Sequence, residues 1–140
     1  MRKFFTLFLA VSFGVTVYGQ TDCSDLYFSE YIEGGSNNKA FEIYNPTSAD
    51  IDLTGYGVAL FSNGGTTTTN ILQLSGTIAS GDVYIVANSQ SSTDILNEAD
   101  TTHTVTFFNG NDALALGKVN GMAFDTLDII GVIGQSSTWT

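Results

Sequence analysis

The chain has 140 residues, one cysteine, one histidine and a formal net charge of −10. One cysteine excludes an intramolecular disulfide and a cysteine-rich zinc site, and one histidine excludes chemistry that needs two within this chain. The acidic excess argues against direct nucleic-acid binding, which normally uses Lys and Arg to displace counterions from phosphates.

The first residues have the three-part layout of a secretory signal peptide. Arg2 and Lys3 precede an apolar run, and Val17-Tyr18-Gly19 supplies small or modest residues before a cleavage site. The apolar run is shorter than the roughly 20 residues of a membrane span, and no later stretch approaches that length. We therefore predict a signal peptide over residues 1–19, a protein that is secreted or held at the cell surface, and a mature chain without a membrane span.

The predicted mature chain is strongly acidic. Residues 20–25 would form a short lead, and residues 26–140 would form one domain. All fourteen Asp and Glu lie in residues 20–140 against only Lys39 and Lys118, which gives this part a formal charge of −12. Such a charge favours solubility and attracts cations, but it does not determine the fold.

Short runs rich in Val, Ile, Phe and Tyr alternate with Gly, Asn, Asp and Ser along the chain. These runs predict strands at residues 26–32, 40–44, 56–61, 71–74, 83–87, 105–108, 113–116 and 127–133. Only residues 92–100 fit a short helix, with Ser92 or Thr93 as its N-cap. Many short strands with so little helix predict an all-β protein, an antiparallel sandwich or barrel.

The stretch SEYIEGGSNNKAFEIYNP at residues 29–46 predicts the first hairpin. A symmetric register around residues 34–38 pairs Glu33 with Lys39, Tyr31 with Phe41, and Ser29 with Ile43. The aromatic and aliphatic members of these pairs would then share the face that packs on the core. A bulge at Gly34-Gly35 would shift the register by one residue and reverse the two faces.

The same register places Glu30 directly opposite Glu42 on the outer face. Like charges in this arrangement destabilise a sheet. We therefore expect the pair to be relieved by splaying into water, by a nearby hydrogen-bond donor or by a cation.

The stretch at residues 29–46, followed by IDLTGYGVALFSNGG, resembles the opening of a bacterial lamin tail domain. LSGTIASGDVYIVANS, FNGNDALALGK and LDIIGVIG follow in the order of that family, so the resemblance runs from about Leu26 to Gln135. It implies an immunoglobulin-like antiparallel β-sandwich that is not itself catalytic. Family members usually continue past a tryptophan like Trp139 into a final strand. We therefore expect the sandwich to lack its last strand and the domain over residues 26–140 to be truncated at its C-terminus.

The resemblance also predicts the class of function. Bacterial members are common in secreted and cell-surface proteins, often joined to extracellular nucleases, other hydrolases or adhesive modules. We expect a non-catalytic binding or targeting module of an exported protein, with an unknown protein or cell-surface component as its partner. The alternative is an N-terminal accessory domain of an extracellular nuclease or related hydrolase whose catalytic domain lies beyond residue 140. A third reading is a calcium-dependent adhesion domain.

The residues themselves offer little catalytic chemistry. His103 is the only histidine base, and residues 134–138 lack the final glycine of a G-x-S-x-G elbow. Glu30 and Glu42 could meet as a glycosidase pair, but no pocket-forming features accompany them in the sequence. Solvated charges on an outer face are the favoured interpretation, so we predict no catalytic residues and no cofactor.

Calcium requires a separate assessment, because it takes six to eight oxygen ligands from carboxylates and carbonyls. Possible sources are Glu30 with Glu42, Asp50 with Asp52, and the turn at residues 109–112. None matches the twelve-residue loop of an EF-hand. We predict no metal site and keep Glu30, Glu42 and Asp112 as the calcium candidates of the adhesion reading.

Overall fold

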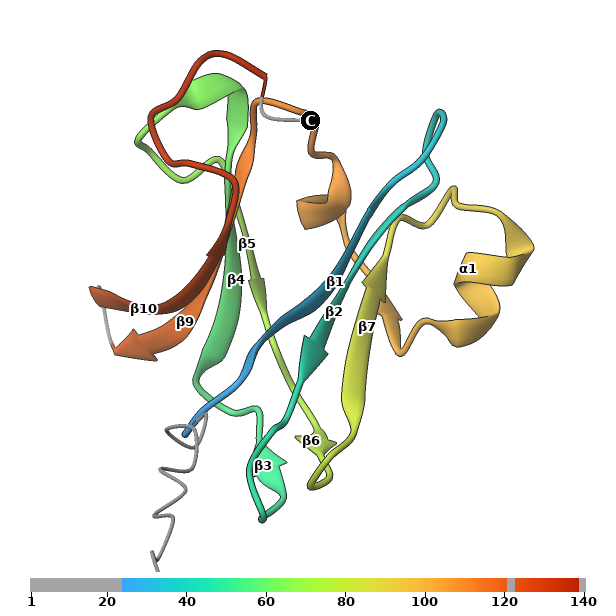
Figure 1. The fold of residues 1–140 in the computed structure, drawn as a ribbon, viewed down its shortest axis with the longest axis vertical. Coiled ribbons are helices and arrows are strands. Elements are labelled where there is room, and N and C mark those ends of the chain that lie inside the picture. Colours follow the sequence, from blue (N-terminus) through green and yellow to red (C-terminus); the bar gives the residue numbers. More distant parts are fainter. Residues whose placement is uncertain (1–23, 121–122, 139–140) are drawn as a thin grey trace, which may run out of the picture.

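The computed structural model describes residues 24–120 and 123–138, which form two packed β-sheets (Figure 1). The predicted signal peptide at residues 1–19, residues 20–23 of the predicted lead, and Trp139 lie outside these residues. Within the described part, no helix is long and apolar enough to span a membrane.

Each main sheet has four strands. The first sheet has the order β1 (Tyr27–Glu33), β2 (Lys39–Tyr44), β7 (Val83–Ala87) and β8 (Thr101–Thr102). The second has the order β10 (Ala123–Ile130), β9 (Ala113–Asn120), β4 (Tyr56–Phe61) and β5 (Asn70–Gln73). A separate ribbon pairs β3 (Ile51–Asp52) with β6 (Thr77–Ile78). The helical elements are α1 (Thr93–Glu98) and the 3₁₀ turns η1 (Ser62–Gly64) and η2 (Thr104–Thr106).

The predicted all-β, immunoglobulin-like sandwich is confirmed. Every strand pair is antiparallel except β7 with β8. The core lies between the two sheets and includes the fully buried Phe41, Ile43, Val58, Val86 and Leu116. The expected absence of a last strand rests on where the sequence ends, and it stays a prediction.

The hairpin register is confirmed over most of its length. Glu30 pairs with Glu42, Tyr31 with Phe41, and Glu33 with Lys39. The predicted pairing of Ser29 with Ile43 is wrong, because a bulge between Phe28 and Glu30 places Phe28 opposite Ile43. The bulge turns the Phe28 ring inward, edge-on to Phe41 at 5.5 Å, and leaves the Ser29 hydroxyl outside. Burial of an aromatic ring in place of a hydroxyl explains the shift.

Three predicted strands differ from the structure by more than one residue, and the one predicted at residues 113–116 continues to Asn120 in β9. Residues 105–108 form the 3₁₀ turn η2 and the segment after it, and Val105 and Phe108 are both buried. This three-residue spacing suits a 3₁₀ turn, whereas strand residues three apart would face opposite sides. The strand predicted at residues 127–133 starts earlier and ends at Ile130, before Gly131 with its positive φ of 81°. That left-handed conformation ends the extended backbone.

Asp25 anchors the start of β1 to the second sheet. Its carboxylate pairs with the Lys118 ammonium at 2.5 Å and accepts the Tyr56 hydroxyl at 2.7 Å. Burial raises the pKa of the Asp25 carboxyl, but the bonds from Lys118, Tyr56 and the Leu26 amide outweigh it, so the net pKa is lowered. The pKa of Lys118 is raised, chiefly by the same bond to Asp25.

Candidate binding groove

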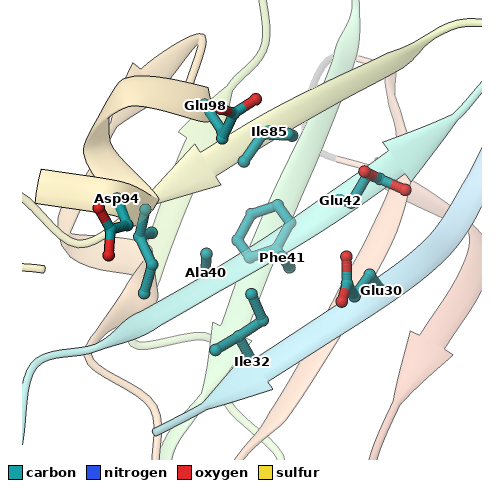
Figure 2. Close-up of a pocket in the computed structure, with 9 residues that line it drawn as sticks. Glu30, Ile32, Ala40, Phe41, Glu42, Ile85, Asp94 and Glu98 are labelled. Atoms are coloured by element: carbon teal, nitrogen blue, oxygen red, sulfur yellow. The ribbon is translucent and has the colours of Figure 1, made fainter. Parts of the chain in front are cut away.

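A groove of about 400 Å³ lies between α1 and the outer face of the first sheet (Figure 2). Its apolar floor includes Ile32, Ile85 and Ile95. Four carboxylates surround this floor: Glu30, Glu42, Asp94 and Glu98. We call this site, with its apolar floor and four carboxylates, the acidic groove.

Strand pairing creates the sheet side of the acidic groove. Glu42 lies between Glu30 on β1 and Ile85 on β7, so these three residues form one row across the sheet. The next row runs from Ile32 through Ala40 to Ala87. Because side chains alternate between faces along a strand, both rows point away from the core. One row thus supplies two carboxylates, and the other supplies apolar surface.

The helix α1 supplies the opposite side. Asp94 and Glu98 are four residues apart, which places them on the same helix face. Two bonds hold the segment before α1 against the β1–β2 loop: the Ser91 hydroxyl donates to the Asn37 carbonyl at 2.8 Å, and the Ser92 amide donates to Asn38 Oδ1 at 2.7 Å. Through these bonds the turn of the first hairpin positions the helix beside the sheet.

The groove concentrates like charge. Glu30 and Glu42 oppose each other across two strands, and α1 has no basic residue in its last turn. The Ser29 hydroxyl donates to Glu42 Oε1 at 2.6 Å, which is one of the three predicted forms of relief. The salt bridges found among residues 24–120 and 123–138 join Lys39 to Glu33 and Lys118 to Asp25, so both lysines of this part pair with carboxylates outside the groove.

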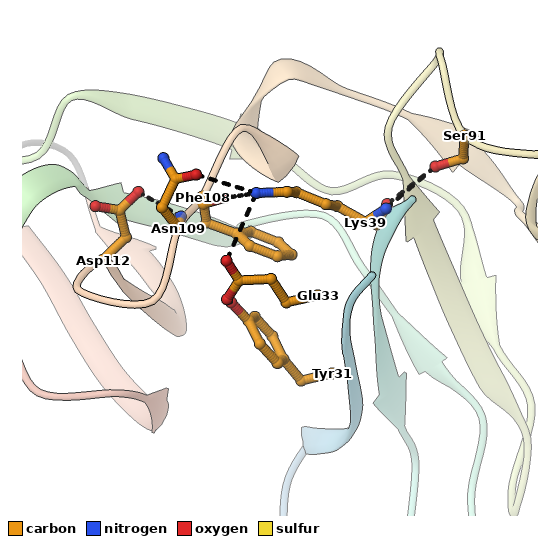
Figure 3. Close-up of polar contacts among 7 residues, drawn as sticks. All are labelled: Tyr31, Glu33, Lys39, Ser91, Phe108, Asn109 and Asp112. Carbon is orange, nitrogen blue, oxygen red and sulfur yellow. Dashed lines mark hydrogen bonds and ion pairs between the residues drawn. The ribbon is translucent and has the colours of Figure 1, made fainter. Parts of the chain in front are cut away.

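Lys39 belongs to a separate buried network (Figure 3). Its ammonium donates to the Phe108 carbonyl oxygen and to Asn109 Oδ1, and it pairs with Glu33 Oε1 at 3.7 Å. The Tyr31 hydroxyl donates to the other Glu33 oxygen at 2.8 Å. Burial, together with this bond to Glu33, raises the pKa of Tyr31. The network ties the end of the first hairpin to the segment before β9, which is a structural role.

The three calcium candidates do not share one location. Glu30 and Glu42 lie together in the acidic groove, whereas Asp112 is buried in the turn before β9. The Asp112 carboxylate accepts the amide N–H groups of Asn63 at 2.5 Å and Asn109 at 2.8 Å. Among the residues that the structure describes, no three His, Cys, Asp or Glu side chains are arranged to hold a metal ion.

The residues considered for nucleophilic chemistry have local roles. His103 precedes η2, and its Nδ1 atom accepts the Val105 amide at 3.1 Å. Ser136 lies against the η1 turn, and its carbonyl oxygen accepts a long bond of 3.5 Å from Asn111 Nδ2. Neither residue lines the acidic groove.

The prediction that no pocket-forming features accompany Glu30 and Glu42 is wrong, because both line the acidic groove. The helix that forms one side of the groove was predicted, but Asp94, Ile95 and Glu98 were not singled out. A signal was present, since two acids four residues apart in a predicted helix share one face. The sequence did not show which surface that face would meet.

Comparison with known proteins gives a family match. A sequence model of the family described as Lamin Tail Domain matches residues 20–131. A search of the curated proteins finds no match. The matched residues include all the strands and the helix that build the acidic groove.

Proposed function

The chain belongs to the lamin tail domain family, and on this basis we propose that it is a non-catalytic binding or targeting module of an exported bacterial protein. The family is an immunoglobulin-like one without catalytic activity of its own. Function in such a module depends on its surface, and the acidic groove is the surface feature that supports binding here.

The shape and the energetics of the acidic groove carry this proposal. Its volume of about 400 Å³ falls within the range of roughly 300–1,000 Å³ that is typical of ligand pockets. Opposed carboxylates on neighbouring strands, and acids four apart on a helix, each destabilise the element that carries them. Residues whose placement destabilises the fold are expected mainly at functional sites.

Retention at the cell surface tests the binding role. The labelled chain is incubated with intact cells of the bacterium that encodes it, and the bound fraction is measured. Ile32→Trp fills the floor of the groove and should abolish retention. Ile129→Trp is the matched control, because Ile129 is 43 % exposed on a strand of the other sheet. Retention that is absent from the start, or that is unaffected by Ile32→Trp, would contradict the proposal.

Export is proposed from the first nineteen residues, which have the layout of a signal peptide. Expression in a bacterial host followed by mass measurement of the exported protein tests it, and a mature chain that begins at Gln20 is the expected result. A chain that stays in the cytoplasm with residues 1–19 attached would contradict this part of the proposal.

The accessory-domain alternative is tested by the DNA beyond codon 140. An open frame that continues into metal-binding His and Asp motifs would support an accessory domain of a nuclease or related hydrolase, and a stop codon would support the small module. The adhesion reading is tested by melting the chain with and without millimolar calcium, because a ligand that binds the folded state raises Tm.

A further inference from the structure

We infer that the acidic groove takes lysine or arginine side chains of a protein partner. This inference rests on the proposed binding function and names the chemistry of the ligand. It follows from three features of the groove: the apolar floor, the carboxylates on both sides, and the pairing of both lysines of residues 24–120 and 123–138 with carboxylates elsewhere.

The floor and the sides of the groove match the two parts of a basic side chain. Lysine and arginine bury their aliphatic stems along apolar surface and keep the charged group in a polar environment. Ile32 and Ile85 on the sheet and Ile95 on α1 offer apolar surface to such a stem. Figure 2 shows Glu30 and Glu42 on one side of this surface, and Asp94 and Glu98 on the helix side.

The electrostatics favour a cation over any other ligand charge. Each side of the groove holds two carboxylates that repel each other, so a bound cation relieves two unfavourable pairs at once. A concave site lined by one sign of charge also focuses the field and raises the local concentration of the opposite charge. The wider acidity of residues 20–140 adds long-range attraction for a basic partner.

A peptide series tests both halves of the match. The probe is a short blocked peptide that carries two lysines, and binding is measured by calorimetry on the full chain at about 20 and 300 mM salt. In one control peptide norleucine replaces lysine, which keeps the stem and removes the charge. In the other, diaminopropionic acid replaces lysine, which keeps the charge and shortens the stem. We expect both controls to bind more weakly than the lysine peptide, and higher salt to weaken the lysine peptide.

Two double variants separate the groove from the overall charge of the chain. Glu42→Gln with Glu98→Gln removes one carboxylate from each side of the groove. Asp50→Asn with Asp52→Asn removes the same charge from exposed positions on and beside β3. We expect the groove variant to bind the lysine peptide about five- to twentyfold more weakly, and the control variant to change affinity less than twofold.

Several outcomes would overturn the inference. Equal losses in the two double variants would mean that only long-range attraction is at work. Equal binding of the norleucine peptide would remove the role of charge, and equal binding of spermidine would make a small cation the ligand.

When the lysine peptide is added, amide shifts in NMR spectra should localise to β2, β7 and α1 in the folded chain. If cell retention requires the groove but the lysine peptide does not bind, this inference is contradicted and the proposed function still holds.

Discussion

Replacing either of two glutamates on β1 with glutamine should change stability in opposite directions. Glu30 opposes Glu42 across the strands, so Glu30→Gln removes a repulsion. Glu33 lies three residues further along, where it accepts the Tyr31 hydroxyl and pairs with Lys39. Glu33→Gln therefore removes an attraction. The chemical change is identical in the two variants, so only the surroundings of each glutamate determine whether the stability rises or falls.

The expected magnitudes follow from the two environments. Opposed charges on a sheet face are worth about 0.2–1 kcal/mol, and Glu30 is exposed, so we expect a gain of about 0.5 kcal/mol in the free energy of unfolding. For a domain of this size that is about 2 °C in Tm. The Lys39 side chain is only 10 % exposed, and weakening its pair with Glu33 should cost about 1–2 kcal/mol, or about 4–8 °C.

Thermal and urea unfolding at neutral pH measure both changes. The gain from Glu30→Gln should shrink at about 0.5 M salt, because screening weakens the repulsion between exposed charges. A double-mutant cycle with Glu42→Gln gives the pairwise part: once Glu42 is neutral, Glu30→Gln should gain little. A loss of stability in Glu30→Gln, or the same gain in the Glu42→Gln background, would refute the claim that these carboxylates repel each other.

Three further changes test the packing around the sheets. Asp25→Asn removes the partner of Lys118 and should cost about 1 kcal/mol. Because the pKa of Asp25 is lowered in the folded state, its contribution to the free energy of unfolding is present above the unfolded pKa of 3.8 and is lost as the pH falls below that value. The Tm of the Asp25→Asn variant should therefore fall less steeply on acidification than the Tm of the unmodified chain. Gly117→Ala places a methyl group 2.6 Å from the Phe124 ring and should lower the free energy of unfolding, measured by urea, by about 1–3 kcal/mol. Asn45→Ala leaves the carbonyls of Ala49, Ile78 and Ala79 without the buried Asn45 amide and should cost about 2–3 kcal/mol in the same assay.

Local patterns were sufficient to predict most of the strands. The strands at residues 83–87 and 56–61 match their predicted bounds, and the strand predicted at residues 40–44 starts one residue earlier. These runs are bounded by turn residues, and their side chains are the β-branched and aromatic types that suit a sheet. The strands β3, β6 and β8 were missed because each has only two residues, too few to show an alternating pattern.

The errors occur where distant residues decide local structure. The bulge at Ser29 depends on a contact between Phe28 and Phe41, which no pattern within β1 reveals. In the same way, η2 forms where Val105 and Phe108 both reach the core, although their sequence favours a strand. Tertiary burial overrode strand propensity in these two places.

The acidic groove was beyond prediction for a related reason. The carboxylates on its two sides are more than fifty residues apart in the sequence, Glu42 and Asp94 being the nearest, and the two sides are joined by the bonds of Ser91 and Ser92 to the hairpin loop. Each side nevertheless carries a local anomaly that can be read from sequence: two acids opposed across a predicted hairpin, and two acids four apart on a predicted helix. Each arrangement destabilises its own element, and the folding of the chain does not require both to lie over one apolar floor. A ligand that is cationic at its end and apolar along its stem supplies that reason. The double variant of Glu42 and Glu98 should therefore gain stability while it loses affinity, a combination that a purely structural role for these carboxylates would not produce.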